Sequence, residues 1–218
     1  MSRSPISPTV PAKPFFMIRH GQSEANVEEV QAGGEWDTPL TEYGRQQARD
    51  NHPILQALET KPVSIVHSQL SRAKDTASLL NEVLKLPMTE DPDVAEQYCG
   101  GWARKPWKDV RTLIQQGISP PDGETHEEFS VRVHRGITNA LNTQESPTMI
   151  VCHGGVFRGF CAPYGIRLPR IENCVLYEFE PLNQPQGNNG FPWVIWEHTA
   201  NGKSVLEPET KSYYSESA

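Results

Sequence analysis

The sequence predicts an α/β fold, a three-layer αβα sandwich with a mostly parallel central sheet. One observation is that short apolar runs alternate along the chain with helix-like segments, an alternation typical of a parallel sheet with helices on both faces. A second is size, because 218 residues, 36% of them hydrophobic, can bury one substantial core and leave little for another domain. We therefore expect a single domain over residues 14–206.

Apolar runs predict the strands. Three strands of the parallel part are expected at Phe15–Ile18, Val63–Val66 and Thr148–Cys152. Near the end of the chain, Cys174–Phe179 and Trp193–Trp196 are predicted to form a hairpin. The stretch from Asn183 to Gly190 between them is rich in Gln, Asn, Gly and Pro and predicts a loop.

Helical patterns follow these runs. They predict helices at Thr41–Asn51, Ser71–Leu84, Trp107–Gln116, Glu124–Leu141 and Gly154–Pro163. Pro53 lies where the first helix would otherwise continue. Because proline lacks an amide N–H and clashes with the preceding turn, the helix should kink or restart there.

The two ends of the chain lack an apolar period. Residues 1–13 carry serine and proline and residues 207–218 form a polar tail, so both are expected to be flexible. No apolar run approaches the roughly 20 residues that cross a membrane. The first 14 residues also lack the apolar region of a secretory signal. We expect a cytoplasmic protein without a membrane partner.

The net charge and the cysteine content limit the kinds of partner and of site that the sequence allows. A net charge of −7 repels polyanions at long range, so no nucleic-acid partner is expected, and an anionic substrate must be bound by a local cationic pocket. The cysteines show no CxxC or Cys/His metal spacing. They are interpreted as reduced packing residues: Cys99, Cys152, Cys161 and Cys174. Neither a metal site nor a cofactor is predicted.

The residues able to perform chemistry follow the first three predicted strands, whose carboxyl ends meet at one edge of a parallel sheet. They are Arg19-His20-Gly21-Gln22-Ser23 with Asn26, then Arg72, then His153-Gly154-Gly155. A lone histidine at a strand end would be interpreted as a satisfied polar residue. His20, however, has a cation on one side and, on the other, a glycine that lets the backbone approach an anion.

These motifs resemble the histidine phosphatase superfamily, the phosphoglycerate-mutase-like enzymes. The resemblance rests on Arg19-His20-Gly21 with Ser23 and Asn26, the run from Pro39 to Ala48, the segment from Ser68 to Ala77, and His153-Gly154-Gly155. The motifs occur in the family's order and extend over about residues 14–200. The resemblance implies a phosphoglycerate-mutase-like fold and a site of two arginines, two histidines and one carboxylate.

The implied site suits attack on a phosphate monoester, which carries about two negative charges near neutral pH. Arg19, Arg72 and a protonated or hydrogen-bond-donating His153 would neutralise the phosphate oxygens. His20 would attack through an unprotonated ring nitrogen while its other nitrogen donates, for instance to a backbone carbonyl. Water would then hydrolyse the phosphohistidine. The expected substrate-binding residues are Gly21, Ser23, Asn26 and Gly154.

A carboxyl group is expected to protonate the leaving alkoxide. From the residues alone, Glu96 would be interpreted as a solvated surface acid. The segment from Ala95 to Trp102 is similar to the family's Glu-x-x-x-Gly-x-Trp stretch, and this resemblance implies that Glu96 is the general acid and base. The family usually continues with Glu-Gly or a similar pair, whereas Ala103-Arg104 follows here, a departure on the substrate side of the pocket.

Hydrolysis is preferred over phosphomutase chemistry. The resemblance implies that a mutase would carry a long insertion between the acid and the second histidine, and the interval from Gln97 to Cys152 is short. The segment from Pro121 to Thr125, with Phe129 and Arg132 downstream, also resembles the Pro-Gly-Gly-Glu-Ser stretch of the phosphatase branch. Glu124 there is expected to start a helix. The predicted substrate is a small-molecule phosphate ester.

Several alternatives stay open. A basic run is interpreted as a solvated helix face, although if it faced the pocket it would favour a second anionic group on the substrate: Arg104, Lys105, Lys108 and Arg111. Three aromatic side chains could line the site and stack on a sugar or base, or could instead serve packing, and neither role is chosen: Trp36, Tyr98 and Trp102. A catalytically silent phosphate-binding module would not need a nucleophile. A metalloenzyme using His126-Glu127-Glu128 and His134 lacks a recognised ligand spacing. The oligomeric state is not predicted.

Overall fold

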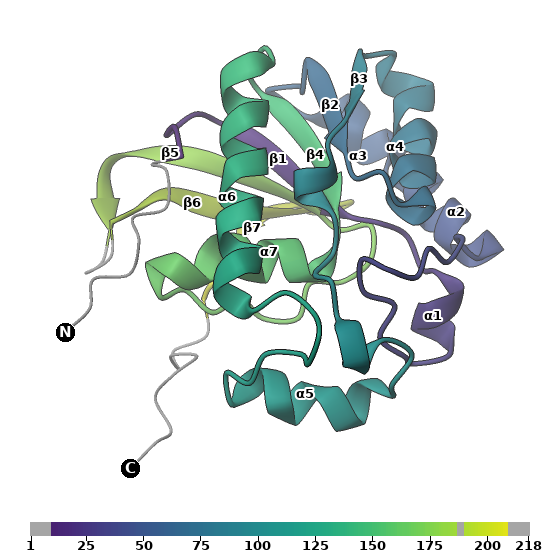
Figure 1. Cartoon of the computed structure of the whole chain (residues 1–218). Coiled ribbons are helices and arrows are strands. Elements are labelled where there is room, and N and C mark those ends of the chain that lie inside the picture. The colour runs from purple at the N-terminus through teal and green to yellow at the C-terminus, as the bar shows by residue number, and fades with distance from the viewer. Residues whose placement is uncertain (1–9, 187–189, 209–218) are drawn as a thin grey trace.

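The computed structural model describes residues 10–186 and 190–208. Its centre is a seven-stranded sheet in the order β3-β2-β4-β1-β5-β6-β7 (Figure 1). The strands are β1 Phe15–Arg19, β2 Ser64–His67, β3 Met88–Glu90, β4 Thr148–Cys152, β5 Leu176–Gln186, β6 Phe191–Thr199 and β7 Gly202–Val205. β3, β2, β4 and β1 are parallel, which confirms the predicted parallel core. β5, β6 and β7 extend it as antiparallel strands.

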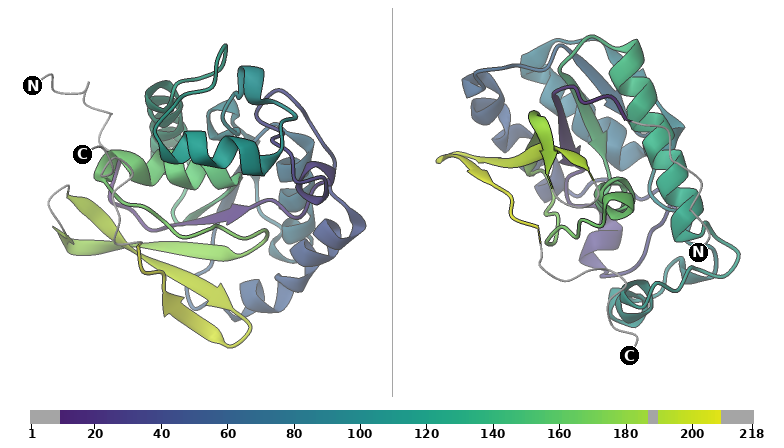
Figure 2. Two further views of the ribbon diagram at one scale, coloured as in Figure 1. Left: turned by 90° about the horizontal axis from the view of Figure 1, so that it is seen from below. Right: turned by 90° about the vertical axis from the view of Figure 1, so that its left-hand side faces the viewer.

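Helices cover both faces of the sheet, as Figures 1 and 2 show. The helices are α1 Glu24–Val27, α2 Glu42–Asp50, α3 His52–Ala57, α4 Ser71–Leu84, α5 Trp107–Gln115, α6 His126–Thr143 and α7 Gly154–Cys161. Three 3-10 turns are η1 Pro92–Val94, η2 Gly100–Trp102 and η3 Ala162–Tyr164. Side chains of α6 and α7 share one core cluster with the sheet, and side chains of α3 and α4 share the other. The predicted three-layer sandwich is confirmed.

Strand β1 contributes to both cores because successive side chains of a strand point to opposite faces. Phe15 and Met17 lie in the cluster with α6 and α7, whereas Phe16 and Ile18 lie in the cluster with α3 and α4. All four side chains are fully buried. Burying each contributes about 1.5–3 kcal/mol, which holds the end of β1, where the predicted chemistry begins, in a rigid position.

The predicted helices lie close to their expected bounds. α4 begins and ends at the residues predicted for it, Ser71 and Leu84. The restart at Pro53 is also confirmed, because α2 ends at Asp50 and Pro53 occupies the first turn of α3. Proline fits there since the first N–H groups of a helix have no partner within the helix.

Helix α6 begins two residues later than predicted, at His126. Thr125 Oγ1 accepts a hydrogen bond from the backbone N–H of Glu128 at 3.1 Å, and the Glu128 carboxylate accepts one from the Thr125 N–H at 2.9 Å. This reciprocal pair satisfies N–H groups at the start of the helix. Glu124 was expected to start the helix; it lies before the cap instead.

The predicted loop from Asn183 to Gly190 is partly wrong. β5 continues to Gln186, and residues 187–189 lie outside the described residues. The pairing of β5 with β6 shifts register between Pro181 and Gln186. A shift of this kind accommodates prolines, which cannot donate to the ladder, so the loop-like composition concealed a strand.

Three short elements had no prediction: α1, β3 and β7. Each has only three or four residues. Segments this short span about one helical turn or at most two strand repeats, so the sequence carries little periodic signal for them.

Part of the expected flexible N-terminal segment is packed against the domain. Val10 is 2% exposed, and the Trp193 indole N–H donates to the carbonyl oxygen of Lys13 at 2.9 Å. The Lys13 ammonium donates to the carbonyl oxygen of Leu141 at 2.7 Å. The expectations for residues 1–9 and 209–218 fall on residues outside those described.

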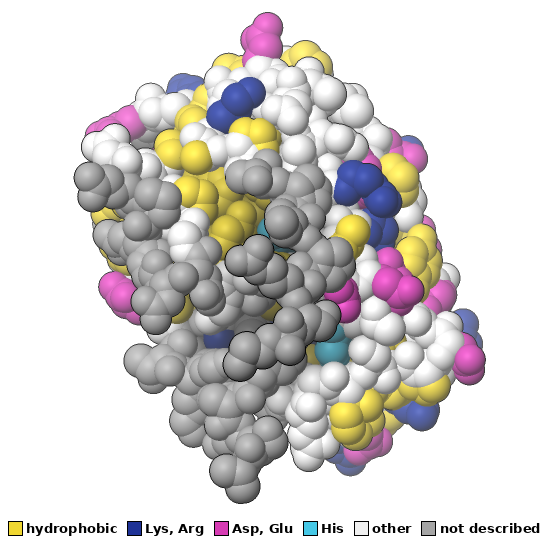
Figure 3. Space-filling view, turned by 60° about the vertical axis from the view of Figure 1, so that its left-hand side comes forward, with side chains coloured by type: hydrophobic (Ala, Val, Ile, Leu, Met, Phe, Trp, Pro, Cys, Tyr) yellow, Lys and Arg dark blue, Asp and Glu magenta, His cyan; other side chains and the backbone are white. Residues whose placement is uncertain are grey.

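The face shown in Figure 3 carries charges of both signs, and the cysteines form no disulfide bonds. On the face shown in Figure 3, acidic and basic side chains are interspersed. Within residues 10–186 and 190–208, none of the helices combines the length and the apolar character needed to cross a bilayer. The four cysteines are free and buried, as predicted.

Candidate active site

The predicted residues converge where β1 and β4 end. These strands pair in parallel, with Arg19 opposite Cys152, so His20 and His153 follow neighbouring strand ends. Their rings lie 5.1 Å apart between centroids. A pocket opens beside His20. Its lining residues come from the end of β1 and the residues after it, from α1 and the loop that follows, from the starts of α4 and α5, and from the segment before η2: Arg19, His20, Ser23, Asn26, Val30, Gln31, Ala32, Gly33, Arg72, Glu96 and Trp107.

The His20 imidazole is held in one tautomer. Its backbone N–H donates to the Cys152 carbonyl oxygen at 2.9 Å, and its Nδ1 lies 2.7 Å from the Gly21 carbonyl oxygen. Because a carbonyl oxygen only accepts, Nδ1 carries the proton and Nε2 of the neutral ring has a free lone pair. Burial, then the charges of Arg72 and Arg19, hold the pKa of His20 well below its ordinary 6.5. The ring is therefore neutral at physiological pH.

The loop after His20 is pressed against α2 and α4. A Cβ on Gly21 would collide with the carbonyl oxygen of Gly44, and one on Gly44 would collide with that of Gln22. The Gly21 N–H donates to Thr76 Oγ1 at 3.0 Å. Only glycine permits this backbone approach, so the Arg-His-Gly loop has a fixed path over the two helices.

Arg72 lies in the first turn of α4 and is 1% exposed. Its guanidinium donates to the carbonyl oxygens of Gly33 at 2.9 Å and Trp36 at 3.2 Å. Asp37 lies 3.8 Å from Nη1. Because a guanidinium has five N–H groups, these bonds orient it and leave donors for an anion.

Arg19, the other cation, ends β1. Its Nη1 donates to the Ile171 carbonyl oxygen at 2.8 Å, and its buried Nε has no hydrogen-bond partner among the described residues. Burial lowers the pKa of both Arg19 and Arg72, and the Glu96 carboxylate opposes that shift in each. Both guanidinium groups stay charged, since arginine does not deprotonate in proteins.

His153 caps the N-terminus of α7 and is fully buried. Neither of its ring nitrogens has a hydrogen-bond partner among the described residues. Burial, followed by the charges of Arg72, His20 and Arg19, lowers its pKa well below 6.5. An unpartnered buried imidazole costs free energy that a hydrogen-bonding ligand could recover, so His153 is suited to bind an anion. Gly154 follows beside Arg19: a Cβ on Gly154 would lie 3.5 Å from Arg19 Nε.

Glu96 is the one carboxylate among the described lining residues of the pocket. Its Oε1 accepts from the Gln97 N–H at 2.9 Å, and its Oε2 accepts from the Gly155 N–H at 3.1 Å. A Cβ on Gly155 would collide with the carboxylate. The start of α7 thus positions both His153 and the Glu96 side chain.

Ser23 and Asn26 form the floor after the Arg-His-Gly loop. The Ser23 hydroxyl is buried without a hydrogen-bond partner among the described residues. The Asn26 Oδ1 accepts from the Ser23 N–H at 3.1 Å. The Ser23 hydroxyl is therefore available to a ligand, whereas the Asn26 Oδ1 is already occupied by the backbone.

Comparisons with known proteins show the family of this chain. A family model of the histidine phosphatase superfamily (branch 1) matches residues 15–180. The chain belongs to the histidine phosphatase superfamily. All four motifs on which the resemblance rested begin and end inside the matched range.

Proteins similar to this chain include named phosphatases and a probable phosphoglycerate mutase. Adenosylcobalamin/alpha-ribazole phosphatase of Escherichia coli (strain K12) is 30% identical over 153 residues, covering 65% of this chain and 74% of the relative. A probable phosphoglycerate mutase, GpmB, of Yersinia pestis (strain Pestoides F) is 27% identical over 199 residues, which cover 83% of this chain and 89% of the relative. The alpha-ribazole phosphatase structure from Shigella flexneri has a TM-score of 0.65 at 28% identity, covering 78% and 91%.

Residues of this histidine phosphatase site that had no prediction include Gln31 and Trp107 of the pocket and Asn173 behind His20. Gln31 lines the pocket, donates from Nε2 to the Cys99 sulfur at 3.0 Å, and leaves its buried Oε1 without a partner among the described residues. Asn173 donates to the His20 carbonyl oxygen at 2.7 Å. Gln31 lies in a stretch without an apolar period, and Asn173 is distant in sequence, so neither carried a signal.

The basic run does not line the pocket. Its four side chains are exposed and absent from the lining residues, in agreement with the solvated-face interpretation. The Arg104 guanidinium lies 4.6 Å from the Trp36 ring. Trp107, between Lys105 and Lys108, lines the pocket instead.

Two further candidate residues from the sequence, Trp102 and His134, are buried in the protein interior. Trp102 is 4% exposed in a small core with Cys99 and Val110, so it does not line the site. His134 Nε2 lies 2.9 Å from the Phe160 carbonyl oxygen, inside the core. Among the described residues, no group of three or more His, Cys, Asp or Glu side chains is placed to hold a metal ion.

Proposed function

We propose that this protein is a metal-independent phosphatase that hydrolyses phosphate monoesters of small molecules through a phosphohistidine on His20. The observation that carries the proposal is the hydrogen bond between His20 Nδ1 and the Gly21 carbonyl oxygen. It leaves Nε2 as a neutral nucleophile beside two arginines, Arg19 and Arg72. A neutral imidazole held in the correct tautomer needs no additional base to attack phosphorus.

The proposed role of the cationic side chains is to bind the phosphate group. Arg72 is buried and Arg19 half-buried beside His20, and the rings of His153 and His20 lie 5.1 Å apart between centroids. Together with the Ser23 hydroxyl, they offer donors to the three non-bridging oxygens, whose charge would otherwise repel a nucleophile. Donors already in place cost no reorganisation when the transition state forms.

The reaction has two balanced steps. In the first, His20 Nε2 forms a bond to phosphorus as the ester P–O bond breaks, and Glu96 gives its proton to the leaving oxygen. In the second, Glu96 takes a proton from water while the water oxygen bonds to phosphorus, the P–N bond breaks and phosphate leaves. Glu96 regains its proton and His20 its lone pair, so the enzyme returns to its starting state.

A phosphomutase is the alternative, and the similarity to a probable phosphoglycerate mutase favours keeping it. The two functions share the first step and differ in whether water or a second hydroxyl accepts the phosphoryl group. The similarity to alpha-ribazole phosphatases supports hydrolysis. Release of inorganic phosphate in excess over phosphoryl transfer distinguishes the two.

The test is hydrolysis of nitrophenyl phosphate and a panel of sugar phosphates, phosphoglycerates and nucleotides, in the presence of a chelator, by wild type and His20→Ala. We expect chelator-resistant release of phosphate that the variant loses. The ranking of the panel identifies the substrate class. A wild type that binds phosphate but turns over none of these esters would contradict the proposal and support a silent binding module.

A further inference from the structure

The residue proposed as the general acid lies in a segment with little regular structure. Between β3 and η2 the chain forms only the turn η1, and Glu96 follows that turn. Backbone carbonyl groups in such a segment have no ladder partners and need donors from elsewhere. The position of Glu96 is therefore set by the groups that supply those donors.

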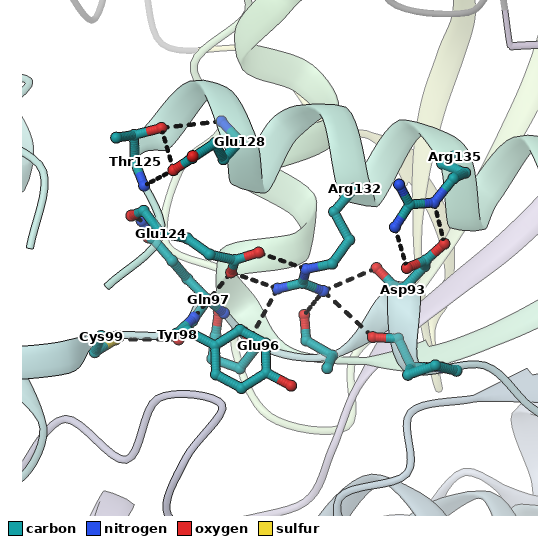
Figure 4. Close-up of polar contacts among 12 residues, drawn as sticks. Asp93, Glu96, Gln97, Tyr98, Cys99, Glu124, Thr125, Glu128, Arg132 and Arg135 are labelled. Carbon is teal, nitrogen blue, oxygen red and sulfur yellow. Dashed lines mark hydrogen bonds and ion pairs between the residues drawn. The ribbon is translucent and has the colours of Figure 1, made fainter. Parts of the chain in front are cut away.

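One side chain of α6, Arg132, supplies most of them (Figure 4). The two N–H groups of its Nη1 are shared among three carbonyl oxygens, those of Asp93 at 3.0 Å, Ala95 at 3.1 Å and Pro92 at 3.3 Å. Its Nη2 donates to the carbonyl oxygen of Glu96 itself at 3.1 Å. A single guanidinium thus contacts the backbone along the whole approach to Glu96.

Glu124 holds that guanidinium in place. Arg132 Nε and Nη2 each donate to one oxygen of Glu124, both at 2.7 Å, and the two side chains are 11% and 17% exposed. A bidentate pair of this kind has a defined geometry as well as favourable energy. The Glu124 carboxylate also accepts from the Tyr98 N–H at 2.9 Å. The pair therefore makes hydrogen bonds to the backbone on both sides of Glu96.

Hydrogen bonds also connect Glu124 to the Glu96 carboxylate through Gln97. The Gln97 N–H donates to Glu96 Oε1, while Gln97 Nε2 donates to the Glu124 carbonyl oxygen at 2.9 Å. Arg158 of α7 donates to Gln97 Oε1 at 2.9 Å. A displacement of Glu124 would move Gln97 and with it one of the two hydrogen bonds that orient the carboxylate.

We propose that Arg132 and Glu124 are positioning residues that hold the carboxyl group of Glu96 at the pocket for proton transfer. The inference rests on the proposed acid role of Glu96. Neither Arg132 nor Glu124 lines the pocket, so both act through the backbone and the side chains of the segment that contains Glu96. A misplacement of about 1 Å in a reacting group costs on the order of 100-fold in rate, so a precise hold has a measurable effect.

Arg135 provides a matched control. It lies one turn further along α6 and forms a bidentate pair with Asp93 at 2.6 and 2.7 Å. Its side chain is 56% exposed, and it contacts the Asp93 carboxylate rather than the backbone next to Glu96. Because Arg135 makes no contact with the backbone next to Glu96, its replacement should leave the acid in place even though the pair with Asp93 is lost.

The experiment compares nitrophenyl phosphate, whose leaving group needs little protonation, with an alkyl phosphate, whose leaving group needs a full proton. The variants are Arg132→Lys, Glu124→Gln, Arg135→Lys and Glu96→Gln. We expect kcat on the alkyl phosphate to fall about 10- to 100-fold more than on nitrophenyl phosphate in the first two and in Glu96→Gln. Arg135→Lys should retain the wild-type ratio. Inhibition by inorganic phosphate should be unchanged in Arg132→Lys, Glu124→Gln and Arg135→Lys, which shows that each of these variants is folded with an intact phosphate site.

The outcomes separate this inference from the proposed function. If Glu96→Gln is selective for the alkyl phosphate but Arg132→Lys and Glu124→Gln lose both substrates equally, the positioning role is overturned and the proposed function stands. If Glu96→Gln itself is unselective, the acid role fails and the inference fails with it. Should Arg132→Lys not fold, Glu124→Gln decides alone, because the amide is isosteric and retains an acceptor for Arg132.

Discussion

His20 Nδ1 donates a hydrogen bond to the carbonyl oxygen of Gly21 across 2.7 Å. The bond joins two adjacent residues, and Gly21 is in turn held by Thr76 and by close contact with Gly44. The tautomer of the nucleophile therefore depends on how the loop packs against α2 and α4. Packing of the sheet, the path of the loop and the chemistry of the imidazole are linked through this one contact.

The first prediction concerns the protonation of His20. Burial and the charges of Arg72 and Arg19 lower its pKa well below 6.5, so the ring should stay neutral as pH falls through that value in the phosphate-free protein. Nitrogen NMR of the imidazole should show a protonated Nδ1 and an unprotonated Nε2 at neutral pH. A titration midpoint for His20 at or above 6.5 would contradict this.

The second prediction is a pH dependence of stability. Burial lowers the pKa of His153 well below 6.5, so below pH 6.5 the unfolded state binds a proton that the folded state does not. The free energy of unfolding should fall as pH decreases from 6.5 toward the folded-state pKa, by about 1.4 kcal/mol per pH unit for each such histidine. Urea unfolding without phosphate at several pH values should show a shallower fall in His153→Asn. An unchanged slope would argue against a neutral, buried His153.

The third prediction concerns phosphate binding. Arg72→Gln removes a buried cation whose guanidinium the Gly33 and Trp36 carbonyl oxygens orient. Charged hydrogen bonds contribute about 1.5–3 kcal/mol each, so the inhibition constant of phosphate should rise roughly 10- to 100-fold. Arg49→Gln, an exposed arginine 3.6 Å from Glu82, serves as the control and should leave it unchanged. Equal inhibition constants in the two variants would place Arg72 outside the phosphate site.

The fourth prediction concerns Gly155. A methyl group there would collide with the Glu96 carboxylate, so Gly155→Ala should displace the acid. Turnover of an alkyl phosphate should fall by at least about tenfold relative to nitrophenyl phosphate. Gly154→Ala adds its methyl group at an ordinary contact distance from Arg19 and should have a smaller selective effect. Wild-type selectivity in Gly155→Ala would mean that the carboxylate works from another position.

Residues that follow strand ends were predictable from the sequence. His153 comes directly after the fully buried strand β4, and His20 follows the buried run Phe15–Ile18 after one residue, Arg19; parallel strands place such residues side by side. The apolar runs themselves were recognisable because both faces of β1 and β4 are covered. The central strands, the main helices and the arginine and histidine pairs could therefore be expected before the structure.

Glu96 could be predicted only through the family resemblance. It follows β3, a strand of three residues, and a single turn, so no pattern in the sequence indicates where its carboxylate points. Its environment is created by Arg132 and Gly155, which are far along the chain. Asn173 contacts His20 across 153 positions in the sequence, and no local signal reports a contact at that distance.

The most direct test of the account is to trap the phosphoenzyme. Wild type mixed with nitrophenyl phosphate is stopped in alkali, in which phosphohistidine survives, then digested and mapped by mass spectrometry, with His20→Asn treated in parallel. The account predicts one phosphoryl group, on His20, absent from the variant and lost on treatment with acid. Turnover without any covalent phosphate, or a phosphoryl group on His153 in place of His20, would contradict it.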